Sequence, residues 1–79
     1  MTLPDRLSKV LDCLDGNEQS TAEIATLLFA NWFELASLPL ITGRLRELER
    51  WGLASRRPVN DPTGGTMYLW RRIEQEETE

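Results

Sequence analysis

Residues 37–72 read SLPLITGRLRELERWGLASRRPVNDPTGGTMYLWRR, and this stretch decides the fold. Its first half predicts a helix, because apolar residues recur every three or four positions and so share one stripe. These residues are Leu38, Ile41, Leu45 and Leu48. Ser37 can cap the helix, Pro39 suits its first turn, and Gly52 ends it. The runs LASRRPV and TMYLWRRI follow, separated by the turn-like NDPTGG, and predict a β-hairpin.

Two further helices are expected before this stretch. The first has an apolar side made of Leu7, Val10, Leu11 and Leu14, with Pro4 in its first turn and Gly16-Asn17 after its end. Ser20 and Glu23 form a capping box at the start of the second, ahead of Ile24, Leu27 and Leu28. The end of the second helix stays open, because FANWFELA, residues 29–36, contains no Gly or Pro. Either this helix is long, or an aromatic connector precedes the third helix.

Together these elements predict a mainly α domain with a small β-hairpin over residues 1–73, followed by an acidic, disordered tail at 74–79. A chain of 79 residues removes only about 60% of its unfolded surface on folding, so its stability margin is thin. The expected core consists of Leu7, Leu11, Leu14, Ile24, Leu27, Leu28, Ile41, Leu45, Leu48 and Leu53. Tyr68 and Trp70 share one face of the last strand, and we expect both to pack inward.

The composition argues against an enzyme. The chain has no histidine, which removes the commonest general base and the commonest metal ligand. Its lone Cys13 cannot form an internal disulfide, so we expect it to pack as a small apolar residue. No run approaches membrane length, and the N-terminus lacks the pattern of a secretory signal. We therefore expect a cytoplasmic protein without a catalytic, cofactor or metal site.

Charge is unevenly distributed along the chain. Residues 1–41 carry two cationic and six acidic side chains, whereas residues 42–73 carry seven arginines and three acidic side chains. Four glutamates follow in residues 74–79. The planar donor fork of arginine suits phosphates and guanine edges, so residues 42–73 predict contact with nucleic acid. The alternative is that these arginines pair with neighbouring glutamates.

The side of the third helix opposite its apolar stripe carries Pro39, Gly43, Arg46, Glu47 and Arg50, flanked by Thr42 and Arg44. We expect Arg46 and Arg50 to point at the partner, and Glu47 to pair with Arg44 or Arg50. Glycine in an exposed helix interior costs about 1 kcal/mol relative to alanine. Gly43 is therefore explained either by close approach to a groove wall or phosphate, or by tight packing against the aromatic connector.

The segments TAEIATLL, SLPLITGRLRELERWGLASRR and GGTMYLWRR resemble the small winged helix-turn-helix transcription regulators of bacteria, phages and plasmids. RLRELERWGLASRR is similar to the end of the recognition helix and the first wing strand in families that include the MarR-type and ArsR-type repressors. The resemblance implies a dimer on duplex DNA, with the third helix in the major groove and the hairpin tip, residues 60–65, against the backbone or minor groove. The residues expected to contact DNA are Pro39, Thr42, Gly43, Arg44, Arg46, Arg50, Arg56, Arg57 and Thr63.

A second interpretation is a winged-helix module that binds protein rather than nucleic acid. The acidic total and the aromatic residues Trp32, Phe33 and Trp51 favour it, although these rings could also fill the core. If Phe29, Trp32 and Phe33 stay outside the core, they leave an apolar patch for a partner to cover. A second copy is the simplest partner, so we expect a homodimer through these three residues.

Overall fold

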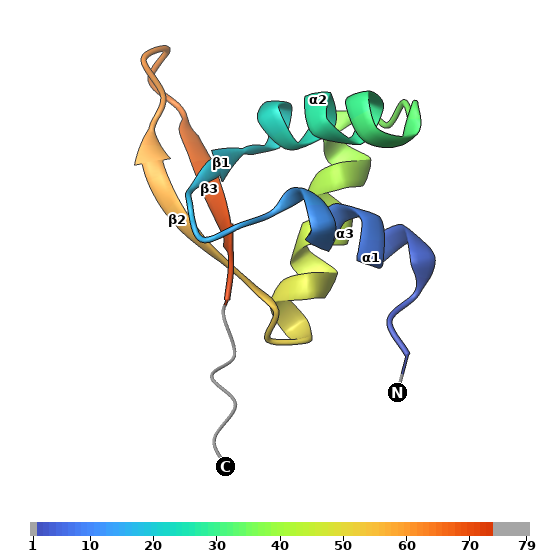
Figure 1. Ribbon diagram of the computed structural model, residues 1–79. Helices are drawn as coiled ribbons and strands as arrows, with labels where there is room; N and C mark the ends of the chain where they lie inside the picture. The colour runs from blue at the N-terminus through green and yellow to red at the C-terminus, as the bar shows by residue number, and fades with distance from the viewer. Residues whose placement is uncertain (1, 74–79) are drawn as a thin grey trace.

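The computed structural model describes residues 2–73, which form three helices and a three-stranded antiparallel sheet (Figure 1). In chain order the elements are α1 (Asp5–Cys13), β1 (Gln19–Ser20), α2 (Thr21–Trp32), α3 (Leu38–Arg50), β2 (Ala54–Asn60) and β3 (Thr66–Arg72). The three predicted helices and the hairpin are confirmed. The short strand β1 was not predicted, so the fold is mixed α and β rather than mainly α with a lone hairpin. This arrangement is compatible with a winged-helix topology. The predicted tail, residues 74–79, lies outside the described residues.

The helix starts follow from local capping chemistry. The Ser20 hydroxyl accepts from the Glu23 amide and the Glu23 carboxylate accepts from the Ser20 amide, both at 3.2 Å, which confirms the capping box. The Ser37 hydroxyl accepts from the Leu40 amide at 3.4 Å at the start of α3. In α1, Pro4 is the capping residue itself rather than a member of the first turn.

The end of α2, which the sequence left open, lies at Trp32. Phe33 follows in the left-handed conformation, with φ 53° and ψ 27°, and its amide donates to the Phe29 carbonyl at 2.8 Å. Residues 33–37, called the connector below, then lead to α3. Both alternatives hold in part, since Phe29 and Trp32 belong to the helix whereas Phe33 belongs to the connector.

The end of α3 and the hairpin turn both require glycine. Gly52 has φ 78°, and the Leu53 amide donates to the Leu48 carbonyl at 3.0 Å, which closes the helix. Gly64 has φ 96° in the turn, where the Asp61 amide donates to the Gly65 carbonyl at 2.9 Å. The stop and the turn expected from the sequence are therefore confirmed.

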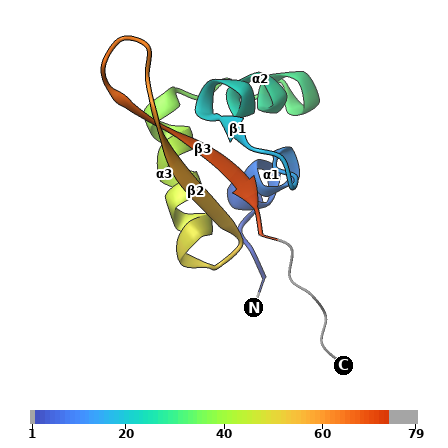
Figure 2. The ribbon, with the colours of Figure 1, turned by 90° about the vertical axis from the view of Figure 1, so that its left-hand side faces the viewer.

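The sheet has the strand order β1-β3-β2, with one face against the helices and the other open (Figures 1 and 2). Arg56 lies opposite Trp70 and Pro58 opposite Tyr68, so these residues share the face toward the helices. Arg57 lies opposite Leu69, and both belong to the outer face. Because side chains alternate along a strand, the neighbours Arg56 and Arg57 lie on opposite faces of the sheet.

The core lies between the helices and the inner face of the sheet. Eight of the ten predicted core residues are buried, whereas Leu27 and Leu53 are partly buried at its margin. The residues that complete the core are Val10, Cys13, Ala54 and Trp70. Burial, with the nearby Asp12 and Glu34 carboxylates, raises the pKa of the Cys13 thiol to about 11, so it stays protonated at neutral pH.

Tyr68 lies farther out than predicted, and Leu38 lies farther out than the other residues of its stripe. Trp70 is fully buried, but Tyr68, two residues closer to the hairpin tip, remains 37% exposed. The prediction that both rings pack inward is therefore correct only for Trp70. Leu38 belongs to the apolar stripe of α3 but lies at the first turn, where it remains half exposed. Across residues 2–73, the helices are all too short or too polar to span a bilayer.

Candidate nucleic-acid interface

The outward side of α3 carries two exposed cations one helical turn apart, Arg46 and Arg50. Within residues 2–73 neither arginine has an acidic partner within ion-pair distance. Pro39, also exposed, lies on the same side nearer the helix start. Glu47, at the edge of this side, is 3.4 Å from the Arg6 guanidinium of α1, so the predicted pairing with Arg44 or Arg50 is wrong. This contact directs the Glu47 carboxylate toward α1, so Glu47 does not neutralise Arg46 or Arg50.

Gly43 lies between Pro39 and Arg46 on this outward side. A Cβ atom built at Gly43 would have no heavy atom within 4 Å, apart from its chain neighbours and its own helix backbone. The explanation by tight packing against the connector is therefore wrong. The space above Gly43 is open, so the backbone of α3 is accessible to a partner at this position.

Arg44 does not lie with Arg46 and Arg50. Its guanidinium is 3.7 Å from the Glu34 carboxylate of the connector, and its side chain is only 15% exposed. Two of its nitrogen atoms are buried without a hydrogen-bond acceptor in the described residues. Arg44 therefore holds the connector against α3 and is not presented to an external partner.

Arg56 bridges α3 and the sheet. Its Nε atom lies 3.3 Å from the Glu49 carboxylate, and its guanidinium lies 4.6 Å from the centre of the Tyr68 ring and 5.9 Å from that of Trp70. Both distances are in the range of cation–π contacts. This arginine of the hairpin is thus turned inward and neutralised by a carboxylate of α3.

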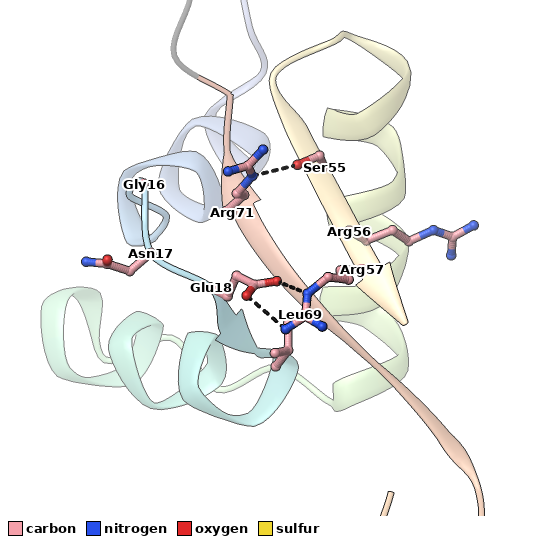
Figure 3. A pocket seen from close by; sticks show the side chains of 8 residues that line it. All are labelled: Gly16, Asn17, Glu18, Ser55, Arg56, Arg57, Leu69 and Arg71. Atoms are coloured by element: carbon pink, nitrogen blue, oxygen red, sulfur yellow. Dashed lines mark hydrogen bonds and ion pairs between the residues drawn. The ribbon is translucent and has the colours of Figure 1, made fainter. Parts of the chain in front are cut away.

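Arg57 lies on the outer face of the sheet, in an open hollow of about 650 Å³ (Figure 3). Its Nε and Nη2 atoms donate to the two carboxylate oxygens of Glu18 at 2.6 and 3.0 Å, and these bonds lower the pKa of Glu18. Nearby, Arg71 Nε donates to the Ser55 hydroxyl at 3.3 Å. Figure 3 shows Arg56 pointing away from this hollow. The charge of Arg57 is therefore compensated within the chain.

The predicted arginines do not form one continuous basic face. Arg46 and Arg50 lie together, whereas each of the other three predicted arginines pairs with a glutamate of another element: Arg44 with Glu34, Arg56 with Glu49, and Arg57 with Glu18. The alternation of a β-strand was sufficient to predict the separation of Arg56 from Arg57. Two of the partners, Glu34 and Glu18, come from segments that only the tertiary fold brings near the arginines.

At the hairpin tip, Thr63 is exposed and fixed by a local turn. Its amide and hydroxyl donate to the Asp61 carboxylate at 3.0 and 2.8 Å, and these bonds lower the pKa of Asp61. Because the hydroxyl proton is used inside the turn, Thr63 offers an external partner only an acceptor. Its position at the tip agrees with the expected placement, but the nearby carboxylate reduces its suitability for a phosphate.

An apolar groove of about 330 Å³ lies between the starts of α2 and α3 and strand β3. Leu38 and Thr42 line it from α3, and Met67 and Tyr68 line it from β3. Thr42 was predicted at this interface from the sequence, but the apolar residues were not, because Leu38 shares a stripe with the core residues of α3 and Tyr68 was expected to pack inward. The groove adds methyl and aromatic contacts next to the outward side of α3.

The aromatic residues around the end of α2 are exposed. Phe33 is 80% exposed, and its ring meets that of Phe29 edge to face with centroids 5.6 Å apart. Trp32 and Trp51 are also exposed, so the interpretation that these rings fill the core is wrong. Phe29, Trp32 and Phe33 stay outside the core, so the apolar patch predicted for that case is present.

Over the described part of the chain, no three metal-ligating side chains cluster together. No protein-family model matches this chain, and no curated protein is significantly similar to it.

Proposed function

We propose that this protein is a sequence-specific, duplex DNA-binding transcription regulator of the winged-helix type. The observation that carries the proposal is the outward side of α3, where Arg46 and Arg50 have no acidic partner within residues 2–73 and Gly43 leaves the backbone open. A major groove about 12 Å wide admits one α-helix. An exposed helix with unpaired arginines fits that groove in both shape and charge.

In this proposal the roles on α3 follow from position. Arg46, in the middle of the outward side, donates to guanine acceptors, whereas Arg50, one turn later, binds a phosphate. Pro39 and Gly43 allow the helix to approach the groove wall closely. Thr42, beside the apolar groove, contributes a methyl group and a hydroxyl to base edges.

The paired arginines have a different role in this proposal. Arg56 holds the hairpin against α3 through Glu49 and Tyr68, and Arg44 holds the connector through Glu34. Both position the surfaces that meet DNA, and their charges are already compensated. Few phosphates are then neutralised, so the salt dependence of binding is shallow for a DNA-binding protein.

The test is a titration of the full chain against random-sequence and candidate-operator duplexes at several salt concentrations. With two to four phosphates neutralised, we expect log K to fall against log salt with a slope of about −2 to −4. Arg46→Gln and Arg50→Gln should each weaken binding about tenfold. Arg57→Gln removes the same charge from the outer face of the sheet and should change affinity less than about twofold.

Two results would overturn this assignment. One is the absence of binding at low salt. The other is an equal effect of Arg46→Gln and Arg57→Gln, since that would make α3 no more important than the outer face of the sheet.

A winged-helix module that binds protein without DNA remains the second candidate. The pairing of Arg44, Arg56 and Arg57 with glutamates favours it, because three of the five predicted arginines already have an acidic partner within the chain. It is the function we infer if duplex DNA does not bind at low salt.

A further inference from the structure

Five exposed apolar residues surround the junction between α2 and α3. They are Phe29 and Trp32 of α2, Phe33 and Leu35 of the connector, and Leu40 of α3, and we call them the connector surface. Leu40 lies one turn before Arg44 on the same side of α3, and Arg44 contacts Glu34 of the connector. All five residues therefore belong to the junction between α2 and α3, between positions 29 and 40 of the sequence.

The backbone at Phe33 indicates that this surface has a role beyond folding. Phe33 has φ 53°, a conformation that glycine adopts freely and bulky side chains adopt rarely. Glycine is the usual residue at this position after a helix. Because the ring is 80% exposed, it adds little to the core in return. A strained position that keeps a large exposed ring points to a partner that covers it.

The charge pattern indicates what kind of partner fits. Glu34 is the only charged residue between positions 24 and 43 of the sequence. Glu34 is paired with Arg44, so the connector surface has no uncompensated charge at its centre. A partner recognised by charge gains nothing here. A second copy of this chain can approach without like-charge repulsion, despite the net charge of −4.

The exposed area also fits a second copy. Typical side-chain areas, scaled by the exposed fractions of these five residues, give on the order of 500 Å² for one copy. If they are fully covered, two such surfaces remove about 1,000 Å² from water, which is the minimum for a biological interface and less than the roughly 1,200 Å² at which stable complexes begin, so the expected dimer is a weak one. We infer that the connector surface is a two-fold self-association interface, with Phe33 and Leu35 as its centre.

This inference is independent of DNA binding. Four of its five residues belong to the end of α2 and the connector, and Leu40 lies on the Arg44 side of α3 rather than on the side of Arg46 and Arg50. Self-association can therefore be measured on the full chain without DNA, and its failure would leave the proposed function untouched.

The experiment is sedimentation equilibrium of the full chain from about 5 to 500 μM, combined with thermal unfolding. We expect the wild type to dimerise within this range. Leu35→Glu, at a side chain 84% exposed, should weaken dimerisation at least tenfold because it places two like charges in the interface. Phe33→Gly should weaken it similarly while leaving the unfolding temperature at low concentration unchanged or higher, because the backbone strain is relieved. Trp51→Ala, an exposed aromatic residue outside the connector surface, is the matched control and should dimerise as the wild type does.

Three outcomes would overturn the inference. The first is a wild type that stays monomeric at 500 μM. The second is a dimer that survives both Leu35→Glu and Phe33→Gly. The third is a Trp51→Ala variant that loses dimerisation as fully as these two. Leu35→Glu keeps the test decisive even if Phe33→Gly alters the end of α2.

Discussion

Gly43 combines a local cost with an open position, and this combination gives a prediction for a single residue. Glycine in the interior of α3 lowers helix stability, and a Cβ at this site meets no atom within 4 Å. Gly43→Ala should therefore raise the free energy of unfolding by about 0.5–1 kcal/mol in urea denaturation. If α3 approaches a groove wall here, the same change should weaken DNA binding, so stability and affinity should move in opposite directions.

Gly52 is the matched control for this measurement. It also meets no neighbour, but its φ of 78° strains any other residue. Gly52→Ala should lower the free energy of unfolding by about 1 kcal/mol. If Gly43→Ala were also destabilising, an unrecognised contact above α3 would be required, and the proposed open approach to this helix would be wrong.

Leu38 shows that helical periodicity alone does not predict whether a residue is buried. The period of α3 correctly predicted that Ile41, Leu45 and Leu48 are buried, because neighbouring elements surround those turns. The same period placed Leu38 with them, but the helix begins there and its first turn lies beside an open groove. The periodicity of a helix determines the side on which a residue lies, whereas its burial also depends on whether another element packs against that turn of the helix.

Among the elements, the ones with local chemical signals were predictable. The capping box at Ser20, the cap at Ser37, the stop at Gly52 and the turn before Gly65 depend on residues adjacent in sequence. Strand β1 has only two residues, too few for any period, and exists because Gln19 and Ser20 pair with Trp70 and Leu69. The same holds for the candidate interface. The outward position of Arg46 and Arg50 was predictable from helix geometry, whereas the pairing of Arg44 with Glu34 and of Arg57 with Glu18 depends on tertiary contacts.

The Arg57–Glu18 pair connects β2 to the segment before β1, and it predicts a pH dependence of stability. The hydrogen bond from Arg57 lowers the pKa of Glu18 in the folded protein below its ordinary value of 4.5. Folding therefore gains stability from this carboxylate above pH 4.5, and loses it as the pH falls through the lower folded value. Because both side chains are well exposed, the gain is small.

Glu18→Gln isolates this contribution. The variant should be less stable than the wild type at pH 7, and the two should converge as the pH falls below the folded pKa of Glu18. Asp61, whose pKa is also lowered, titrates in both proteins and cancels from the difference. Thermal unfolding of both proteins between pH 2.5 and 7 measures this difference in stability. A difference that is constant at every pH would show that the stability lost in Glu18→Gln is not electrostatic.

For the whole molecule, the distribution of charge matters more than its total. The net charge of −4 equals the contribution of the four glutamates in residues 74–79, so residues 1–73 sum to zero, since −4 − (−4) = 0. Residues 74–79 lie outside the described part of the chain, and their charge is known from the sequence alone. If the Arg46–Arg50 side of α3 binds DNA as proposed, binding should be sensitive to an acidic segment that can compete with phosphates for these arginines.

Deleting residues 74–79 should therefore tighten non-specific duplex binding, by about threefold to tenfold at low salt. The effect should fade at about 0.3 M salt, where the screening length is well below the roughly 10 Å that applies at 0.1 M. A variant with Glu74, Glu76, Glu77 and Glu79 all replaced by glutamine keeps the length of the chain and should match the deletion. If the deletion tightened binding and the glutamine variant did not, the segment would act by its bulk. If neither changed affinity at low salt, residues 74–79 would not compete for the Arg46–Arg50 side of α3.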